Sequence, residues 1–336
     1  MTPCVTVVIP NWNGERLLST CLGSLHKQSF RDFETIVVDN GSTDGSVALV
    51  NRNFPKVRVL TLGENRGFSA AVNAGIKASR AEYVALLNND TETDPEWLGA
   101  LVRAAETHPE AGLFATKLVD FYDRRLLDGA GDALRRSGLP YRLGHGEPDR
   151  GQYDRPGFVL SACAAAALYR QSMLDDVGLF DEDFFAYCED GDLSMRAQLA
   201  GYRCLYVPEA IVYHMGSAST GKRSPFATRL GTRNGLCLLV KNLPAALVPR
   251  MLPFVLAGQL SRLLVATLTS TLRAHLRGLA GTLVLLPQML EKRQEIQKRR
   301  QVPVGYVRQL LKESSRAAGA SLRRRLAHRL GSGSKP

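Results

Sequence analysis

The sequence predicts an α/β protein in which a mostly parallel sheet is flanked by helices and followed by a helical extension. Two observations support this fold class. Short β-branched runs alternate with helical patterns through the first third of the chain, with short turns between them. Near residue 236 the alternation gives way to apolar, arginine-containing segments. We therefore expect a sheet domain over residues 1–235 and a basic, apolar helical region over residues 236–336.

The expected elements follow from hydrophobic periodicity. Four apolar runs have the length and composition of buried strands: VTVVI (5–9), ETIVV (34–38), VRVLTL (57–62) and YVALL (83–87). Helical patterns lie near 15–28, 44–52, 67–79 and 95–107, with Asp94 as the expected N-cap of the last. Further along, we expect a helix over 189–201 that ends at Gly201, then strands over 202–207 and 211–216.

A polar stretch follows each of the four strands. These stretches are PNWNG (10–14), DNGSTDG (39–45), GENRGF (63–68) and NNDTETD (88–94). Turn chemistry alone explains Asn, Asp and Gly in any one loop. Ligands of open α/β sheets bind outside the carboxyl ends of the strands, so four such loops at one edge favour a binding site.

Charge is distributed unevenly along the chain. Residues 1–220 carry 21 basic and 29 acidic residues, whereas residues 221–336 carry 22 basic and only 3 acidic residues. A basic segment suits nucleic acid or an anionic membrane surface, and its apolar content favours the membrane over nucleic acid. Pro and Arg interrupt every apolar run, so a membrane-spanning helix is not expected.

The last segment has helical spacing of apolar residues among arginines. The stripe consists of Val307, Leu310, Leu311, Ala318, Leu322, Leu326 and Leu330. Two structures fit this pattern: a helix lying in a membrane interface, or a basic helix that packs on the protein or is partly disordered.

The six cysteines form no C-x-x-C pair and no metal-ligand spacing, which indicates buried thiols in a reducing compartment. The N-terminal residues MTPCVTVVIP lack a basic region followed by a long apolar run, so no signal peptide is expected. The expected location is the cytoplasm, at the inner face of the membrane.

Six segments in order resemble the motifs of family 2 glycosyltransferases, in particular the bacterial rhamnosyltransferase-like branch. They are VTVVIPNWNG, ETIVVDNGSTDGS, ENRGFSAAVNAGI, VALLNND, FFAYCEDGDLSMRAQLAG and VYHMGSAS, and together they cover roughly residues 4–235. The resemblance implies the GT-A fold, a Rossmann-like nucleotide-sugar-binding sheet flanked by helices. It also implies a divalent cation and a single displacement that inverts the anomeric centre.

Within this resemblance, Asp39 is expected to accept the N3–H of uracil or thymine; its alternative role is an Asx turn. The expected nucleotide-sugar pocket also includes Pro10, Asn11, Asn13, Asn65, Arg66, Asn88 and Asn89.

The metal is expected at Asp90. The family usually has Asp-x-Asp where this chain has Asn88-Asn89-Asp90, so an amide replaces one acid. His214, in a segment that resembles the family's metal-binding histidine, is the expected second ligand, although a lone His is more often structural. Mg²⁺ takes oxygen ligands and Mn²⁺ also accepts imidazole, so both ions are candidates.

Asp190 is expected to be the general base and Glu189 to orient the acceptor hydroxyl. The alternative is that Glu189, Asp190 and Asp192 only stabilise a helix N-terminus, with Asp192 paired to Arg196. Asp181, in GLFDEDFF, is expected on the acceptor side.

The leading hypothesis is an enzyme that transfers L-rhamnose from dTDP-rhamnose to a lipid-linked or cell-envelope glycan. The alternatives are a UDP-sugar donor (galactofuranose or another hexose) and a nucleotide-sugar-binding protein without catalysis. A processive polysaccharide synthase is not expected, because that class needs a Gln-x-x-Arg-Trp motif. The two Trp residues of this chain, 12 and 97, both lie in the part expected to bind the nucleotide.

Overall fold

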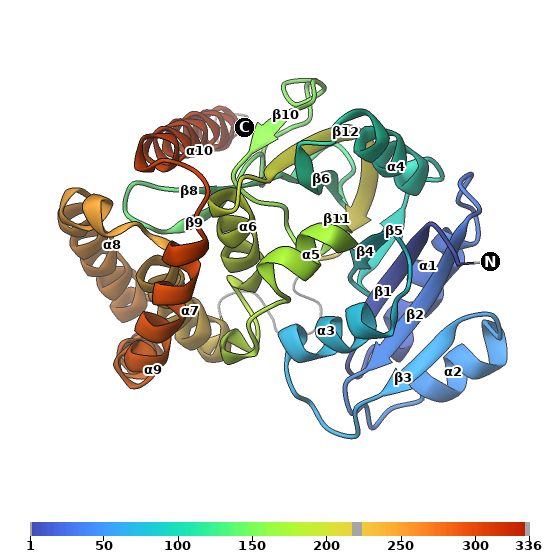
Figure 1. Cartoon of the computed structure of the whole chain (residues 1–336). Coiled ribbons are helices and arrows are strands. Elements are labelled where there is room, and N and C mark those ends of the chain that lie inside the picture. The colour runs from blue at the N-terminus through green and yellow to red at the C-terminus, as the bar shows by residue number, and fades with distance from the viewer. Residues whose placement is uncertain (1, 217–223, 333–336) are drawn as a thin grey trace.

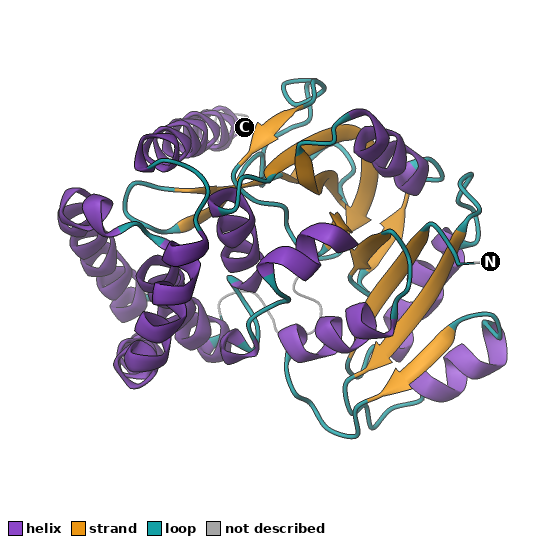
Figure 2. Ribbon diagram, in the orientation of Figure 1, coloured by secondary structure: helices purple, strands orange, loops and turns teal. Residues whose placement is uncertain are grey.

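A computed structural model describes residues 2–216 and 224–332, and its centre is one mixed sheet (Figures 1 and 2). The strand order is β10-β12-β6-β11-β4-β1-β2-β3, with β5 pairing with β12 and β7 with β6. The strands of this sheet are β1 (Val5–Asn11), β2 (Phe33–Asp39), β3 (Arg58–Thr61), β4 (Tyr83–Leu87), β5 (Thr91–Thr93), β6 (Ala111–Asp120), β7 (Leu127–Ala130), β10 (Gly157–Val159), β11 (Ala166–Arg170) and β12 (Arg203–His214). β8 (Asp132–Leu134) and β9 (Pro140–Arg142) form a separate two-stranded sheet.

The first four strands are parallel, as the strand-helix alternation predicts. β1 pairs in parallel with both β2 and β4, and β2 pairs in parallel with β3. β11 is antiparallel to β4 and to β6, which joins this half to the β6–β12 half. The carboxyl ends of β1, β2, β3 and β4 therefore lie along one edge, where the polar loops follow.

Helices cover both faces of the sheet (Figure 2). On one face, α1 (Glu15–Leu25), α2 (Ser46–Asn53) and α4 (Trp97–Thr107) share a core with alternate side chains of β1 such as Val5 and Val7. On the other, α3 (Phe68–Ala78), α5 (Gln171–Val177) and α6 (Glu189–Leu199) pack against Val8 and its neighbours. Because successive side chains of β1 point to opposite faces of the sheet, this strand contributes to both apolar cores.

The early elements match the prediction to within a few residues. One helix starts later than expected, because Asp94 Oδ1 accepts a hydrogen bond from the Glu96 backbone N–H at 2.9 Å and stabilises a turn before α4. The two late strands are one strand, β12, with a register shift between Val207 and Ile211. Gly201, with φ of +97°, follows α6 as predicted.

The C-terminal helices are packed against the sheet half. They are α7 (Pro225–Asn242), α8 (Val248–Leu268), α9 (Leu272–Arg299) and α10 (Val304–Ser332). A short 3-10 helix at Ala245–Leu247 connects α7 to α8, and another at Glu182–Phe184 precedes α6. The contact with the sheet half is made by α7 and α9 through α6 and by α10 through β8. Met195 and Leu199 of α6 share a core with Leu238 of α7 and Met289 of α9. α7 continues without interruption across the expected boundary between residues 235 and 236.

α10 is a helix that packs on the protein over part of the expected stripe, whereas Leu326 and Leu330 near its end are exposed. Val307 and Ala318 are buried, and the Ser314 and Ser321 hydroxyls accept hydrogen bonds from the backbone N–H groups of Leu134 (2.7 Å) and Gly144 (3.0 Å). These contacts place the inner face of α10 against the β8–β9 hairpin and the loop after it.

The expectation that no helix spans a membrane stays a prediction, because length and composition alone do not test it. Ala245–Leu268 forms one helical stretch that is long and apolar enough to cross a bilayer, and only 17% of its most apolar 18 residues are buried. Arg250 and Arg262 interrupt the sequence but not the helix, because arginine is a good helix former.

Candidate functional site

A cavity of about 1310 Å³ opens at the carboxyl ends of β1 and β4 and is bounded on its far side by α6 and α7. Nine of the predicted site residues line it: Pro10, Asn11, Asn65, Asn88, Asn89, Asp90, Glu189, Asp190 and His214. Four others do not line it: Asn13, Asp39, Arg66 and Asp181. The structure therefore gathers the predicted metal ligands and the predicted base in one cavity.

An amide network forms the wall at the end of β1. Asn89 Nδ2 donates to Asn11 Oδ1 at 2.7 Å, and Asn11 Nδ2 lies 3.4 Å from Asp39 Oδ1. Asp39 is buried and its other oxygen accepts the Ser42 backbone N–H at 3.2 Å. The Asp39 carboxylate therefore contacts both Asn11 and the backbone of the turn after β2, and its expected contact with the base stays a prediction.

The loops after β1 and β3 contain the other residues predicted to bind the nucleotide-sugar. Asn13 adopts a φ of 50° and its Oδ1 accepts the Thr43 backbone N–H at 2.8 Å. Asn65 Oδ1 accepts the Gly67 backbone N–H at 3.0 Å, and the exposed Arg66 guanidinium lies 3.9 Å from Glu182. Asn13 and Asn65 shape the loops through these contacts.

Asp90 and His214 meet inside the cavity. β5 begins directly after Asp90 and pairs with the end of β12, which brings the Nε2 atom of His214 to 3.4 Å from the Asp90 carboxylate. Both side chains are buried. Residues 217–219, the end of the VYHMGSAS motif, lie outside the described residues.

Asp128 of β7 fixes the other side of the imidazole. Its carboxylate accepts from His214 Nδ1 at 2.7 Å and lies 2.9 Å from Arg142 and 3.0 Å from His145. Burial acts to raise the pKa of Asp128, but Arg142 and the two histidines outweigh it and hold the pKa well below its usual range. Burial likewise acts to lower the pKa of His214, and Asp128 and Asp90 raise it to about 9.

These residues fit a divalent cation. A carboxylate oxygen and an imidazole nitrogen face the same space, and metal-binding histidines commonly donate their second N–H to a carboxylate, as His214 does to Asp128. A nitrogen-oxygen ligand pair suits Mn²⁺, with diphosphate oxygens and water to complete the shell.

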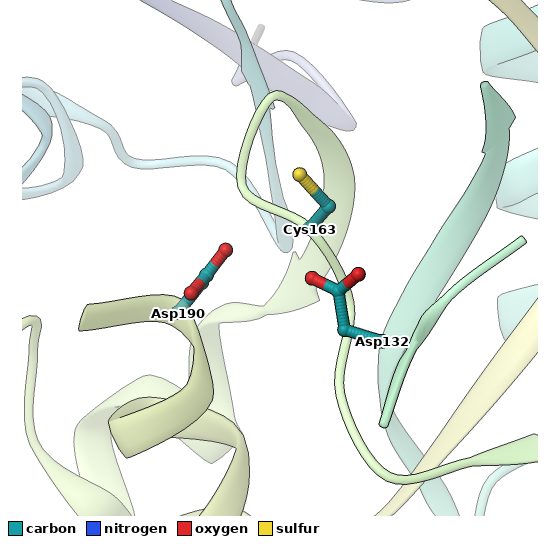
Figure 3. Close-up of side chains that lie close together, drawn as sticks. All are labelled: Asp132, Cys163 and Asp190. Atoms are coloured by element: carbon teal, nitrogen blue, oxygen red, sulfur yellow. The ribbon is translucent and has the colours of Figure 1, made fainter. Parts of the chain in front are cut away.

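Asp190 lies at the start of α6 and points toward Asp132 and Cys163 (Figure 3). The ligand atoms of these three residues are all within 4.8 Å of one another. Asp190 accepts the Gly191 N–H at 2.7 Å and the Ala164 N–H at 3.3 Å. Burial raises the pKa of Asp190 despite these hydrogen bonds and Arg142, and burial with the nearby Asp190 raises the pKa of Asp132 to about 7.

The trio of Asp132, Cys163 and Asp190 does not fit a metal as well as Asp90 and His214 do. Arg142 Nη2 lies 2.8 Å from the Cys163 sulfur and its Nε lies 3.7 Å from Asp132, so a fixed cation already occupies the flank of the trio. Burial raises the pKa of the Cys163 thiol well above its ordinary value, and metals bind the thiolate.

A strained turn presents Glu189 and Asp190 to the cavity. Phe185, Tyr187 and Cys188 all have positive φ, between 62° and 71°. Asn234 of α7 holds this turn, because its Nδ2 lies 2.8 Å from three backbone carbonyls, those of Phe184, Ala186 and Tyr187. Strain of this kind persists where surrounding contacts enforce it, and it is common at functional sites.

The two acidic neighbours of Asp190 differ in their surroundings. Glu189 is buried, its Oε2 has no hydrogen-bond partner among the described residues, and burial together with Asp190 raises its pKa. Asp192 pairs with Arg196 at 3.0 Å, as predicted, and also with Lys241 at 2.8 Å. Asp192 therefore stabilises the α6–α7 contact.

Asp181, which the sequence placed on the acceptor side, lies in a cluster of ion pairs outside the cavity. Its two carboxylate oxygens are each 2.6 Å from an ammonium, one of Lys241 and one of Lys292. It also accepts the Asp183 backbone N–H at 3.2 Å. Its observed contacts join the loop before α6 to α7 and α9.

The sequence reasoning missed four residues of the cavity wall: Asp128, Asp132, Arg142 and Cys163. For Asp128 and Asp132, the available signal was the sequence Asp128-Gly-Ala-Gly-Asp132, in which small residues separate two acids. The strands there are only three or four residues long, too short for a period-2 pattern to reveal them.

The fold and the cavity define a nucleotide-sugar transferase of the GT-A type, and the comparisons agree. The chain belongs to glycosyl transferase family 2, whose family model matches residues 6–178. A relative, the N-acetylglucosaminyl-diphospho-decaprenol L-rhamnosyltransferase of Mycobacterium tuberculosis, is 31% identical over 247 residues, which are 66% of this chain and 79% of the relative.

Solved structures share the fold. S. aureus TarS 1-349 in complex with UDP-GlcNAc has a TM-score of 0.55 at 21% identity and covers 96% of this chain and 92% of its own. The mannosyltransferase PcManGT from Pyrobaculum calidifontis, in complex with GDP-Man and Mn²⁺, has a TM-score of 0.52 at 18% identity, covering 95% of this chain and 87% of its own.

Proposed function

We propose that the protein is an inverting, metal-dependent glycosyltransferase that moves L-rhamnose from dTDP-rhamnose to a hydroxyl of a lipid-linked glycan. One observation carries the proposal: the Asp90–His214 pair and the Asp190 carboxylate line the same cavity at the carboxyl ends of the parallel strands. The lipid-linked acceptor and the rhamnosyl donor are supported by the mycobacterial relative's name. We place the reaction at the cytoplasmic face of the membrane.

The donor is expected to bind along the β1 and β4 ends. Asn11 and Asn89 form a hydrogen-bonded wall there, and Asn88 and Asn65 lie on the same side of the cavity. Asp39 contacts Asn11 at this edge, and we expect its carboxylate to accept a hydrogen bond from the base. Asp90 and His214 would hold the cation, whose chemistry is to neutralise the leaving diphosphate.

The acceptor is expected on the Asp190 side. Ionised Asp190 takes the proton of the acceptor hydroxyl while that oxygen bonds to the anomeric carbon and the diphosphate departs. A raised pKa makes Asp190 a stronger base than an ordinary carboxylate. Burial and the nearby Asp190 raise the pKa of Glu189, which favours its protonated form, and that form donates a hydrogen bond to the acceptor. The single displacement inverts the anomeric centre.

The test is a screen of donor hydrolysis by the full-length protein against dTDP- and UDP-sugars, with and without Mn²⁺ or Mg²⁺. We expect metal-dependent turnover of dTDP-rhamnose. Turnover of a UDP-hexose or of UDP-galactofuranose instead would identify a different donor. Tight donor binding without any turnover, in the presence of acceptor lipid, would favour a binding protein instead.

A further inference from the structure

α8 carries a stripe of exposed leucines that no described part of the chain covers. Leu252, Leu256, Leu260, Leu264 and Leu268 recur every four residues, and between 49% and 77% of each is exposed. Spacing of four places them along one side of the helix. Val265 is also exposed. Side chains of this kind rarely remain in water as one contiguous face unless a partner covers them.

The charged residues of α8, of α7 before it and of the start of α9 after it are all basic. The sequence has no acidic residue between Glu209 and Glu291, a span that includes all of α7 and α8. Arg250 at the start of α8 and Arg273 and Arg277 at the start of α9 are exposed. An aliphatic face bordered by arginines matches a bilayer with anionic headgroups, which accepts apolar side chains and pairs with the cations.

A second copy of this chain fits the face less well. A two-fold contact through α8 would bring basic residues of one copy near basic residues of the other, because neither α7 nor α8 has an acid to pair with them. Protein interfaces also owe most of their affinity to Trp, Tyr and Arg, and leucine is under-represented among such residues. Charge complementarity therefore favours the membrane as the occupant.

The opposite side of α8 is attached to the protein. Gly258 lies so close to Ser137 that an added Cβ would be 2.8 Å from the Ser137 Cβ, and the Arg136 guanidinium lies 3.7 Å from the Phe254 ring centre. Arg262 donates to the Gly231 carbonyl of α7 at 3.2 Å and lines the catalytic cavity. A helix held in this way along one side lies on the membrane surface, because crossing would break these contacts.

We propose that the leucine stripe of α8, with Arg250, Arg273 and Arg277, seats the protein on an anionic membrane, with α8 in the plane of the interface. The same helix reaches the cavity through Arg262, so the membrane lies next to the wall formed by α7 and α8. Resting on the proposed function, this orientation lets a lipid-anchored acceptor reach Asp190 from the bilayer. The membrane contact itself does not depend on which reaction the cavity performs.

The test is co-sedimentation of the full-length protein with phosphatidylcholine vesicles, with and without phosphatidylglycerol. We expect binding to the anionic vesicles that high salt releases. The variant Leu256→Gln, Leu260→Gln, Leu264→Gln should bind at least about tenfold more weakly. The matched control, Leu326→Gln with Leu330→Gln on the exposed side of α10, should bind like wild type. Replacing the three exposed arginines by Gln should abolish the preference for anionic vesicles.

Three results would overturn the proposal. Wild-type vesicle binding unaffected by the α8 triple variant would place the contact elsewhere. A wild-type dimer that the triple variant dissociates, without vesicle binding, would assign the face to self-association. Binding that survives high salt and alkaline washing would indicate a spanning helix. Hydrolysis of the soluble donor, measured on the same variants, should stay at the wild-type rate, so failure of membrane binding remains separate from failure of the proposed chemistry.

Discussion

Asp190 and Glu189 compete for the role of base, and substitution separates them. Asp190→Asn removes the proton acceptor while retaining its shape, so kcat should fall by about 10² to 10⁴. The KM for donor should change little, because Asp190 is expected on the acceptor side. Glu189→Gln retains a hydrogen-bond donor and should lose far less. Steady-state kinetics on both variants measure these changes. A larger loss of kcat for Glu189→Gln than for Asp190→Asn would identify Glu189 as the base.

The shared pocket of Asp190 and Asp132 predicts a shifted pH profile. Only ionised Asp190 accepts a proton, so the rate should rise with pH. Since burial raises the pKa of Asp190, the acidic limb should lie above the ordinary range of an Asp. Asp132→Asn removes the neighbouring carboxyl and should shift the limb to lower pH. An unchanged limb in the pH–rate profile of this variant would contradict the coupling.

Asp128 should govern metal affinity without binding the metal itself. Asp128→Asn removes the charge that holds His214 Nδ1, so His214 can rotate and the affinity for Mn²⁺ should fall by about 10- to 100-fold. Titration followed by electron paramagnetic resonance measures this without substrate. Asp123→Asn, in the nearby turn where Asp123 pairs only with exposed Arg125, is the control. Equal affinities for the two variants would show that Asp128 does not position the ligand.

At the residue scale, sequence reasoning worked where a side chain follows a strand or belongs to a family motif. Asp90 and His214 were found in this way, and the structure brings them together. Asp128 was missed because its importance arises only from long-range contacts, with His214 lying 86 positions away. The motif of Asp39 predicts a contact with the base, but it could not predict that the same carboxylate contacts Asn11 and the Ser42 N–H.

At the scale of elements, a buried ion cluster joins the start of α6 to α7 and α9. Asp181 contacts Lys241 and Lys292, and Lys241 also contacts Asp192. The predicted strands and helices of the first half needed only the local pattern, because each is amphipathic or fully buried over several residues. The contacts between α6, α7 and α9 could not be predicted, because they depend on side chains 49 to 111 positions apart.

The cluster makes a prediction for Asp181→Asn. Burial acts to raise the pKa of Asp181, but Lys241 and Lys292 lower it to about 2, from an ordinary value of 3.8. The folded-state pKa is depressed, so its contribution of about 2 kcal/mol is present above pH 3.8 and is lost as pH falls toward 2. Urea unfolding at neutral pH should show Asp181→Asn less stable than wild type, with a smaller difference in acid.

The same variant tests where Asp181 acts. Because its carboxylate lies outside the cavity, the folded variant should retain donor hydrolysis and transfer to acceptor. Asp183→Asn is the control, since Asp183 is partly exposed and contacts only Lys292 among the cluster lysines. Loss of transfer with unchanged stability would return Asp181 to the acceptor side.

For the whole molecule, the sequence predicted two regions from their charge and periodicity, and the structure connects them through shared cores. The switch from an acidic to a basic chain predicted a helical extension. It could not predict that α10 returns to the sheet half, where it packs on β8 and Ala318 joins the core that includes Ala133. The charge pattern indicates which residues face the solvent, whereas the position where a helix packs depends on how its buried side chains fit the surface that it covers.

This shared core predicts that residues 1–235 alone do not form a stable domain. Such a fragment ends inside α7, and it removes Leu238, Met289 and Val307 from the core around Met195 and Leu199. It also removes Lys241 and Asn242 from the buried Asp192 and leaves Arg196 as its ion-pair partner, and taking one partner out of a buried ion cluster is destabilising. We expect the fragment to be aggregated or to unfold without a cooperative transition, as followed by circular dichroism on heating. A control ending at 332 should match the full chain, and a cooperative, donor-binding fragment 1–235 would establish the two regions as separate folding units.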